Sequence, residues 1–221
     1  MGKSNINQIL KSLQEHYLSK DYDAAAKLLI KHKDELDPGL FHYNLGTVHT
    51  KSGNLAAGRY HLEKSIKNNF VNTKVLNNIS FIERNLAVAD LSNSNNLSDQ
   101  TMNVSLKYSA EAYLGFTLIC LLAVLFAFKK KIIQNKYVVC LFVLLTILPI
   151  GMQQLYLKNI NYAILLKDTE IREGPSAVFV SKSSIQAGSK VIVGEFEAGW
   201  VYIKYPIEHS GWLKRSMLGI Y

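Results

Sequence analysis

The apolar residues of this 221-residue chain follow three different patterns from one end to the other. In residues 1–90 they recur at the three- and four-residue spacing of amphipathic helices. Residues 112–128 and 137–152 form two uncharged apolar blocks of 17 and 16 residues. After residue 162 the pattern changes to short runs of β-branched and aromatic residues between turn residues. The sequence therefore predicts a helical region, two apolar helices and a small β domain, in that order.

The two apolar blocks are candidates for membrane-spanning helices. At about 1.5 Å per residue, each block covers about 25 Å of a hydrocarbon layer about 30 Å thick, and a few flanking residues extend it to about 20 residues. The alternative is a pair of buried core helices, but such helices keep a polar face that neither block has. Cys120 and Cys140 lie inside the blocks, so we interpret them as small apolar residues.

Only residues 129–136 separate the blocks, so the pair is expected to form a helical hairpin. Four lysines lie in this short loop: Lys129, Lys130, Lys131 and Lys136. Because Lys and Arg accumulate on the cytoplasmic side of membrane spans, we expect the loop in the cytoplasm and both chain ends outside. Residues 1–13 lack the apolar core of a signal peptide. Either the sequence begins downstream of a removed signal, or the N-terminal region is cytoplasmic and the loop breaks the rule.

Residues 39–70 combine small and large residues in the way that two closely crossing helices require. The small residues are Gly46, Gly58 and Ser65, and the large ones are Leu45 and Leu62. With a Gly-Asn-Leu turn at 53–55, this stretch resembles a tetratricopeptide repeat. Residues 20–38 reproduce the second half of the pattern 33 residues earlier, after a first helix at 6–18, and 75–89 supply a closing helix. We expect about two and a half repeats over residues 1–90.

The resemblance implies a concave groove, lined by the first helix of each repeat, that binds an extended peptide. The positions that face this groove in such families are Tyr43, Asn44, Thr47, Thr50 and Lys51 in the middle repeat, and Lys74, Asn77, Asn78, Phe81 and Arg84 in the closing helix. Their Asn side chains could hydrogen-bond a peptide backbone, and their Lys and Arg side chains could bind a carboxylate. The alternative is that they are ordinary solvated helix residues.

The remainder of the chain divides into a polar segment and a β region. Residues 91–107 are rich in Asn and Ser without helical or strand period, so we expect a flexible linker. The predicted strands that follow are 163–166, 170–172, 178–180, 190–195, 200–204 and 211–213. Their IREGPS, GWVYI and GWL signposts resemble the bacterial SH3-like barrel. Trp200, Tyr202 and Trp212 could form a surface for a peptide or glycan, unless at least one tryptophan belongs to the core.

The charge distribution and the absence of certain motifs narrow the range of functions expected of the chain. The net charge of +8 is spread along the chain, so no segment is basic enough for nucleic acid. Two cysteines exclude a disulfide scaffold. Five of the six histidines lie in the helical region, without a pair at i, i+4 or an HExxH motif. No phosphate loop or nucleophile elbow is present. We therefore expect no enzyme activity, catalytic residue, metal or cofactor.

The domain order, with repeats at 1–90, a linker at 91–107, a transmembrane hairpin at 108–157 and a barrel at 158–221, resembles the BatE-type proteins of the Bacteroides aerotolerance (Bat) operon. The resemblance implies a multidomain inner-membrane protein with periplasmic ends, working beside von Willebrand A-domain membrane proteins and a MoxR-type ATPase. We expect a non-catalytic scaffold that binds protein partners. Two alternatives stay open: a cell-wall sensor whose barrel binds peptidoglycan, and a regulatory subunit of a separately encoded hydrolase.

Overall fold

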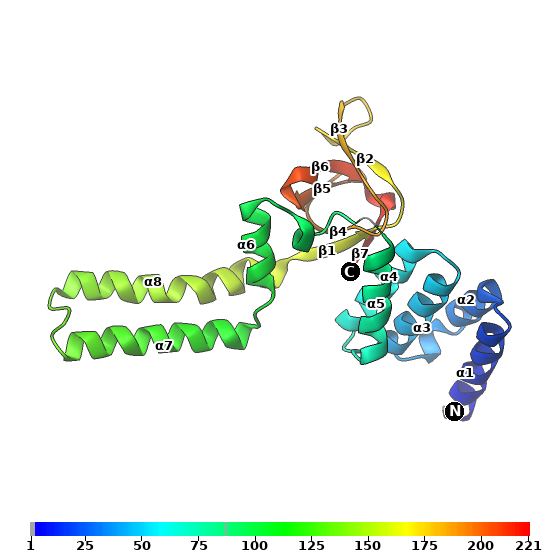
Figure 1. The fold of residues 1–221 in the computed structure, drawn as a ribbon, viewed down its shortest axis with the longest axis horizontal. Helices are drawn as coiled ribbons and strands as arrows, with labels where there is room; N and C mark the ends of the chain where they lie inside the picture. Colours follow the sequence, from blue (N-terminus) through cyan, green and yellow to red (C-terminus); the bar gives the residue numbers. More distant parts are fainter. Residues whose placement is uncertain (1–2, 87) are drawn as a thin grey trace. The chain divides into compact units, whose positions relative to one another are not determined.

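The computed structural model describes residues 3–86 and 88–221, which contain eight α-helices and a seven-stranded antiparallel sheet (Figure 1). The chain forms two compact units. The first unit combines Met1–Ser94 with Asn161–Tyr221, and the second is Asn95–Ile160. The expected mixture of helical and sheet regions is confirmed. The segments that precede and follow the apolar blocks belong to one unit.

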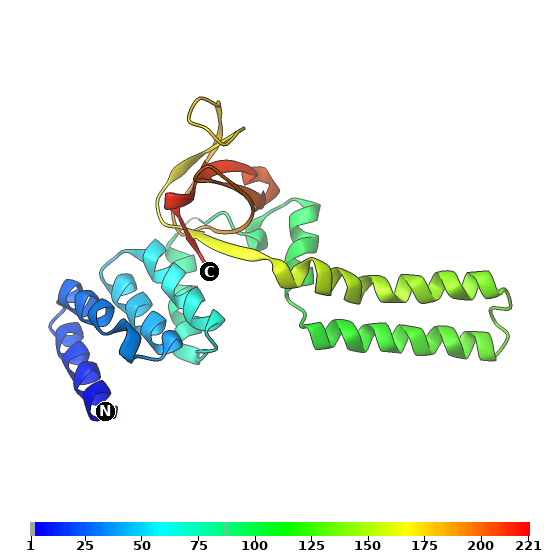
Figure 2. The same ribbon diagram turned by 180° about the vertical axis from the view of Figure 1, so that it is seen from behind.

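Five helices build the N-terminal part of the first unit, and Figures 1 and 2 show successive helices side by side. They are α1 (Lys3–Leu18), α2 (Tyr22–Lys31), α3 (Pro38–Lys51), α4 (Leu55–Lys67) and α5 (Thr73–Asn85). Each helix from α2 to α5 follows an Asp or Asn whose side chain accepts a hydrogen bond from a backbone N–H in the first turn. The helices predicted at 6–18 and 75–89 are confirmed, although the second one ends at Asn85.

Helices α3 and α4 approach each other closely at two glycines. A Cβ atom on Gly46 would lie 2.8 Å from Cγ of Leu62, and one on Gly58 would lie 2.5 Å from Oγ1 of Thr50. Gly53, in the turn between the helices, has a φ of +86°, which glycine adopts without strain. The small residues that the sequence analysis identified therefore lie at a helix crossing, where a larger side chain would push the helices apart.

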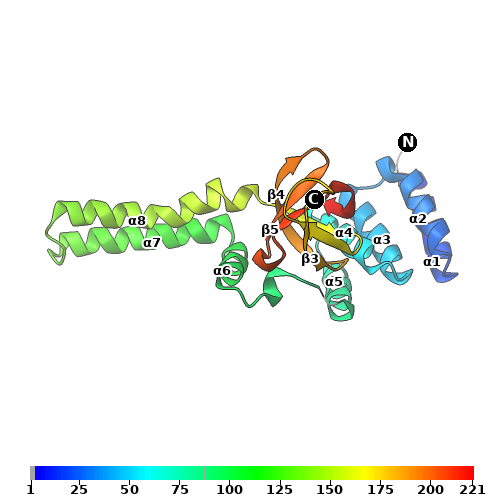
Figure 3. The ribbon, with the colours of Figure 1, turned by 90° about the horizontal axis from the view of Figure 1, so that it is seen from above.

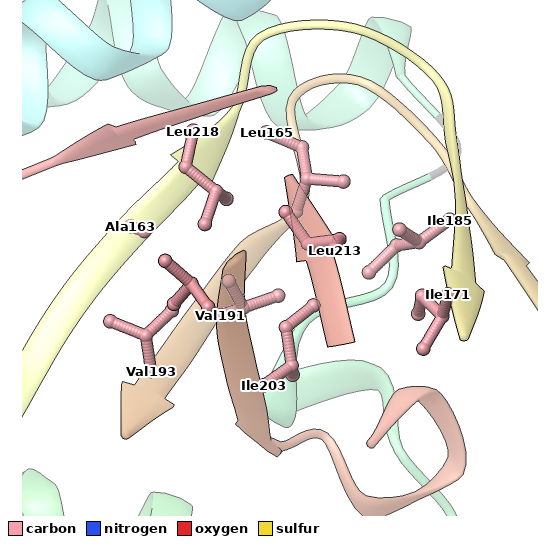
Figure 4. Close-up of a cluster of buried hydrophobic side chains, with 10 residues drawn as sticks. Ala163, Leu165, Ile171, Ile185, Val191, Val193, Ile203, Leu213 and Leu218 are labelled. Atoms are coloured by element: carbon pink, nitrogen blue, oxygen red, sulfur yellow. The ribbon is translucent and has the colours of Figure 1, made fainter. Parts of the chain in front are cut away.

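The C-terminal sheet has the strand order β3-β2-β6-β5-β4-β1-β7. Its strands are β1 (Asn161–Leu165), β2 (Thr169–Arg172), β3 (Ser181–Ile185), β4 (Lys190–Glu197), β5 (Trp200–Tyr205), β6 (Gly211–Lys214) and β7 (Leu218–Ile220). The sheet curls around buried apolar side chains (Figure 4). Val201 and Ile203 alternate into this core, as the pattern of β5 predicts.

The structure corrects two predictions in the sheet. Residues 178–180, expected as a strand, lie in a loop, and the strand beside β2 is β3. The register pairs Thr169 with Ile185, whose side chain is buried. A single buried isoleucine therefore fixes the face of a strand that otherwise consists of Ser and Lys. Strand β7, which pairs with β1, was not expected.

The segment at 91–107 is not the irregular linker that its composition predicts. It contains a short 3-10 helix at Leu91–Asn93 and the helix α6 at Leu97–Leu106. Asn96 caps α6 by accepting a hydrogen bond from the backbone N–H of Ser98 (2.8 Å), and Met102 is buried. Asn and Ser are common in linkers, but the same side chains also start helices, which explains the error.

Two long helices form a hairpin in the second unit, α7 (Ala110–Lys129) and α8 (Lys136–Leu155), and they lie side by side in Figures 1 and 3. Only 6% of the apolar window of each helix is buried. The alternative of core helices fails on this point, because core helices are mostly buried. The predicted apolar helices are confirmed, and each is long and apolar enough to cross a membrane.

Candidate functional site

A cavity of about 280 Å³ opens between the first and third helices. Three of the predicted groove residues, Tyr43, Asn44 and Thr47, line it from α3. The other lining residues are Leu10, Leu13, Gln14 and Tyr17 of α1 and Val48 of α3. The cavity thus combines an apolar wall from α1 with polar groups from α3.

Two polar side chains of this cavity differ in their hydrogen bonding. The hydroxyl of Thr47 donates to the backbone oxygen of Tyr43 (2.9 Å) and accepts a hydrogen bond from Nδ2 of Asn78 on α5 (3.3 Å). The Nδ2 atom of Asn44 is buried and has no hydrogen-bond partner among the described residues. A buried amide without a partner costs free energy, so a ligand that accepts its hydrogen bond would be favoured.

Aromatic rings border the same cavity. The ring of Tyr43 lies 5.3 Å from the ring of Phe70, and the ring of Tyr17 lies 5.9 Å from that of Tyr22. Burial raises the pKa of Tyr17, and the neighbouring Tyr22 and Tyr43 raise it further. The hydroxyl of Tyr17 therefore stays neutral at physiological pH, where it can donate a hydrogen bond.

The other predicted groove residues divide into exposed and buried positions. Asn77, Lys51, Lys74 and Arg84 are exposed, and Phe81 is 45% exposed. Thr50 does not belong to the groove. Its side chain is buried against Gly58 and donates to the backbone oxygen of Gly46 (2.7 Å). The prediction for Thr50 is therefore wrong, because Thr50 lies on the face of α3 that packs against α4.

The contribution of α1 to the cavity was not predicted, although the sequence contains a signal for it. Leu10 and Gln14 stand 33 residues before Tyr43 and Thr47, which is the spacing of the repeat pattern. Applying this offset to the first helix would have placed both residues on the groove. Tyr17 stands 33 residues before the predicted position Thr50 in the same way, whereas Leu13 stands 33 residues before Gly46, which is not a predicted groove position.

The aromatic residues predicted on the sheet surface are only partly available. The rings of Tyr202 and Trp212 pack edge-to-face at 5.4 Å, in line with their pairing across β5 and β6. Trp212 is 9% exposed, whereas Trp200 and Tyr202 are half-buried. Most of the surface of Trp212 is therefore buried by packing, which agrees with the alternative that one tryptophan belongs to the core.

A buried ionic network joins the helices of the first unit to the sheet. The guanidinium of Arg59 on α4 is 1% exposed and donates to Asp90 (3.1 Å), Glu83 (2.9 Å) and the backbone oxygen of Gly188 (2.7 Å). Asp90 also accepts a hydrogen bond from the backbone N–H of Lys190 (2.7 Å). The arrangement fixes the helical region against the β3–β4 turn through a fully paired carboxylate.

A second set of contacts reinforces this junction. Nζ of Lys190 lies 2.8 Å from Oε2 of Glu63 and sits over the rings of Tyr162 and Tyr221. A Cβ atom on Gly219 of β7 would lie 2.4 Å from the ring of Tyr60 on α4. The sheet therefore packs closely on α4, while the cavity is lined by α1 and α3.

Three histidines stack in the helical region, where α3 meets α4. The rings of His42 and His61 lie 5.1 Å apart, with 2.9 Å between their Nδ1 atoms, and His49 stacks on His61 at 5.5 Å. Burial, with smaller contributions from Lys64 and Lys33, lowers the pKa of His42 to about 4. Burial, followed by the neighbouring histidines, lowers that of His61 to about 3. The pair is therefore neutral at physiological pH.

The remaining predicted positions concern the membrane hairpin. Lys129 ends α7, Lys136 begins α8, and Lys130 and Lys131 lie between the helices. The four lysines are thus at one end of the hairpin. Within residues 3–86 and 88–221, no group of three or more His, Cys, Asp and Glu side chains is placed to hold a metal ion.

Comparisons of the chain with family models, with curated proteins and with solved structures find no match in any of the three. The function must therefore be argued from the groove, the hairpin and the sequence patterns themselves.

Proposed function

We propose that this chain is a membrane-anchored, non-catalytic scaffold that holds an extended segment of a protein partner in the groove of its helical region. The observation that carries the proposal is the cavity beside Asn44, whose buried amide nitrogen has no hydrogen-bond partner within residues 3–86 and 88–221. Sites for drug-sized ligands occupy about 300–1,000 Å³. A cavity of about 280 Å³ better suits one side chain of a longer ligand.

An extended peptide satisfies both features of this cavity. One of its apolar side chains would bury against Leu10 and Leu13, and one of its backbone carbonyls would accept the hydrogen bond of Asn44. The exposed cations Lys51, Lys74 and Arg84 favour an acidic segment. In this arrangement the peptide contacts α1, α3 and α5 together, as in a tetratricopeptide groove.

The hairpin of α7 and α8 is proposed as the membrane anchor. The first unit is built from the segments on both sides of this hairpin. A single spanning helix would put those segments on opposite sides of the membrane, whereas two spans return the chain to the side from which it came. The lysines at the turn favour a cytoplasmic turn and a periplasmic first unit.

We further propose that α1–α5 are tetratricopeptide repeats and that the curled sheet is an SH3-like barrel. The glycine crossing of α3 and α4 supports the first assignment, and the short strands around one core support the second. On the resemblance to BatE-type proteins, the partners would be von Willebrand A-domain membrane proteins and a MoxR-type ATPase. The chain would then be an accessory subunit of an inner-membrane complex.

Site-specific crosslinking tests the groove. The full chain carries a photoreactive phenylalanine analogue at Tyr43, and a second version carries it at Lys67, an exposed position on α4. We expect a discrete crosslinked protein at Tyr43 only. Asn44→Leu, which keeps the side-chain size but removes the amide, should reduce its yield at least fivefold. Equal products at both positions, or a yield that Asn44→Leu leaves unchanged, would contradict the proposal.

A further inference from the structure

The loop between β2 and β3 carries an exposed apolar tip. Figures 1 and 2 show it standing out from the curled sheet. Val178 is 91% exposed, Val180 69% and Phe179 47%. Residues 174–180 contain no charged side chain. Single exposed apolar residues are common, but three in a row at a projecting tip indicate a contact surface.

The loop is held in shape by its own contacts. Nη1 of Arg172 donates to the backbone oxygens of Ala177 (3.2 Å) and Phe179 (2.7 Å). The ring of Phe179 lies on Gly174, where a Cβ atom would come within 2.6 Å of it. The backbone N–H of Glu173 donates to the oxygen of Val180 across the neck of the loop (3.3 Å). The exposed tip is therefore preorganised, which lowers the entropy lost on binding.

We propose that Val178, Phe179 and Val180 insert into the headgroup region of the bilayer that anchors this chain. The proposal rests on the membrane anchor proposed above. Helix α8 ends at Leu155 and β1 begins at Asn161. At about 3.3–3.6 Å per residue this connection spans at most about 20 Å, so the sheet is confined close to the lipid surface. A convex apolar tip fits a fluid surface, which needs no matching pocket.

The short connection between α8 and β1 also determines how much affinity the tip needs for the lipid surface. A linked domain experiences an effective concentration in the millimolar range, so a contact with millimolar affinity is occupied. Three partly inserted apolar side chains supply an affinity of that order. A freely diffusing protein partner would need a larger and tighter contact surface than this tip offers.

The charged side chains beside the tip, Glu170, Arg172, Glu173 and Lys182, carry charges that sum to zero, so we expect charge to contribute little to the lipid contact. Arg172 is paired with Glu170 (2.8 Å), and Nζ of Lys182 donates to the backbone oxygen of Ser210 (3.3 Å). Glu173 is exposed beside the loop. We therefore expect insertion into neutral phosphatidylcholine membranes, and we expect added salt to leave it unchanged.

Fluorescence quenching in vesicles of phosphatidylcholine tests the insertion. The full chain carries Cys120→Ser and Cys140→Ser, with one environment-sensitive label at Ala177→Cys. The control is the same label at Ser216→Cys, an exposed position outside the loop. Lipids with a headgroup-level nitroxide should quench the label at 177 at least threefold more than the label at 216. Val178→Ser with Val180→Ser should abolish that difference while leaving the protein folded and bound to vesicles.

Three other outcomes would overturn the proposal. A label at 177 that aqueous iodide quenches as strongly as the label at 216 places the tip in water, even though the anchor holds. If the label at 177 becomes protected from iodide only as the protein density rises, and the lipid nitroxide does not quench it, the tip contacts a second copy of the chain. A protein that does not float with the vesicles would remove the membrane anchor as well.

Discussion

The chain contains two helix pairs with opposite relations to their surroundings. Helices α3 and α4 bury residues on several faces and meet at Gly46 and Gly58, where no side chain fits between them. Helices α7 and α8 are more apolar, yet Thr117 is their single buried residue, and Gly115 and Gly151 face open space. Apolar composition alone therefore does not make a protein core. The first pair is packed within the folded chain, whereas the second pair leaves most of its apolar surface uncovered in the part of the chain that the structure describes.

The largest expected effect comes from removing the charge of Arg59, which is buried on α4. Helices α7 and α8 contain no buried charge. Arg59→Met removes the cation that pairs with Asp90, and leaves a buried carboxylate without its partner. We expect the free energy of unfolding of the first unit to fall by about 3–5 kcal/mol. Urea unfolding in detergent, followed by tryptophan fluorescence, measures this because Trp200 and Trp212 belong to the same unit.

The control for this prediction is Arg84→Met, at an exposed position on α5. It should change the free energy of unfolding by no more than about 0.5 kcal/mol. A loss below about 1 kcal/mol for Arg59→Met would mean that the ionic network does not hold the helices to the sheet.

The second prediction compares glycines in the two helix pairs. Gly46→Ala places a Cβ atom 2.8 Å from Leu62 and should lower the free energy of unfolding by about 2 kcal/mol. Gly115→Ala meets nothing within 4 Å and raises helix propensity, so it should be neutral or slightly stabilising. Urea unfolding checks the first variant, and thermal loss of helical circular dichroism checks both. Similar effects of the two variants would remove the contrast between the pairs.

The third prediction uses the stacked histidines, which only α3 and α4 contain. The folded pKa values of His42 and His61, about 4 and about 3, lie below the unfolded value near 6.5. Below pH 6.5 the unfolded chain therefore binds protons that the folded chain does not, so stability is full above 6.5 and falls toward pH 4. We expect the free energy of unfolding to be about 3–4 kcal/mol lower at pH 5 than at pH 7, with about 2 kcal/mol from each histidine.

The double variant His42→Gln with His61→Gln isolates this effect from the titration of carboxylates. It should lose most of the decrease between pH 7 and pH 5 that the unmodified chain shows in urea unfolding. An equal decrease in both proteins would assign the pH dependence to other groups.

Local features of the sequence predicted much of this fold. The turn at Gly53, the crossing glycines and both apolar helices follow from the repeat pattern and from the length of the apolar blocks. The prediction placed this strand at 178–180 because Val178 and Val180 have a higher strand propensity than the serines that form β3. Its position depends on pairing with β2, and pairing is a tertiary property.

Long-range contacts account for the other differences. The sequence gives no reason to pair Arg59 with Asp90, 31 residues later, or with the turn at Gly188. When these contacts are not known, the segment after α5 resembles a flexible linker, and the helical region resembles an independent domain. In the groove, the helical position of Asn44 was predictable, but its lack of a partner depends on how α1 packs beside it.

The sidedness of three single cysteines in sealed membrane vesicles tests most directly whether α7 and α8 cross the membrane as a hairpin. After Cys120→Ser and Cys140→Ser, the positions are Lys67→Cys on α4, Ser216→Cys after β6, and Gln134→Cys between α7 and α8, all exposed. We expect a membrane-impermeant reagent to label positions 67 and 216 from one side of the membrane and position 134 only from the other. Labelling of all three from the same side would contradict this expectation.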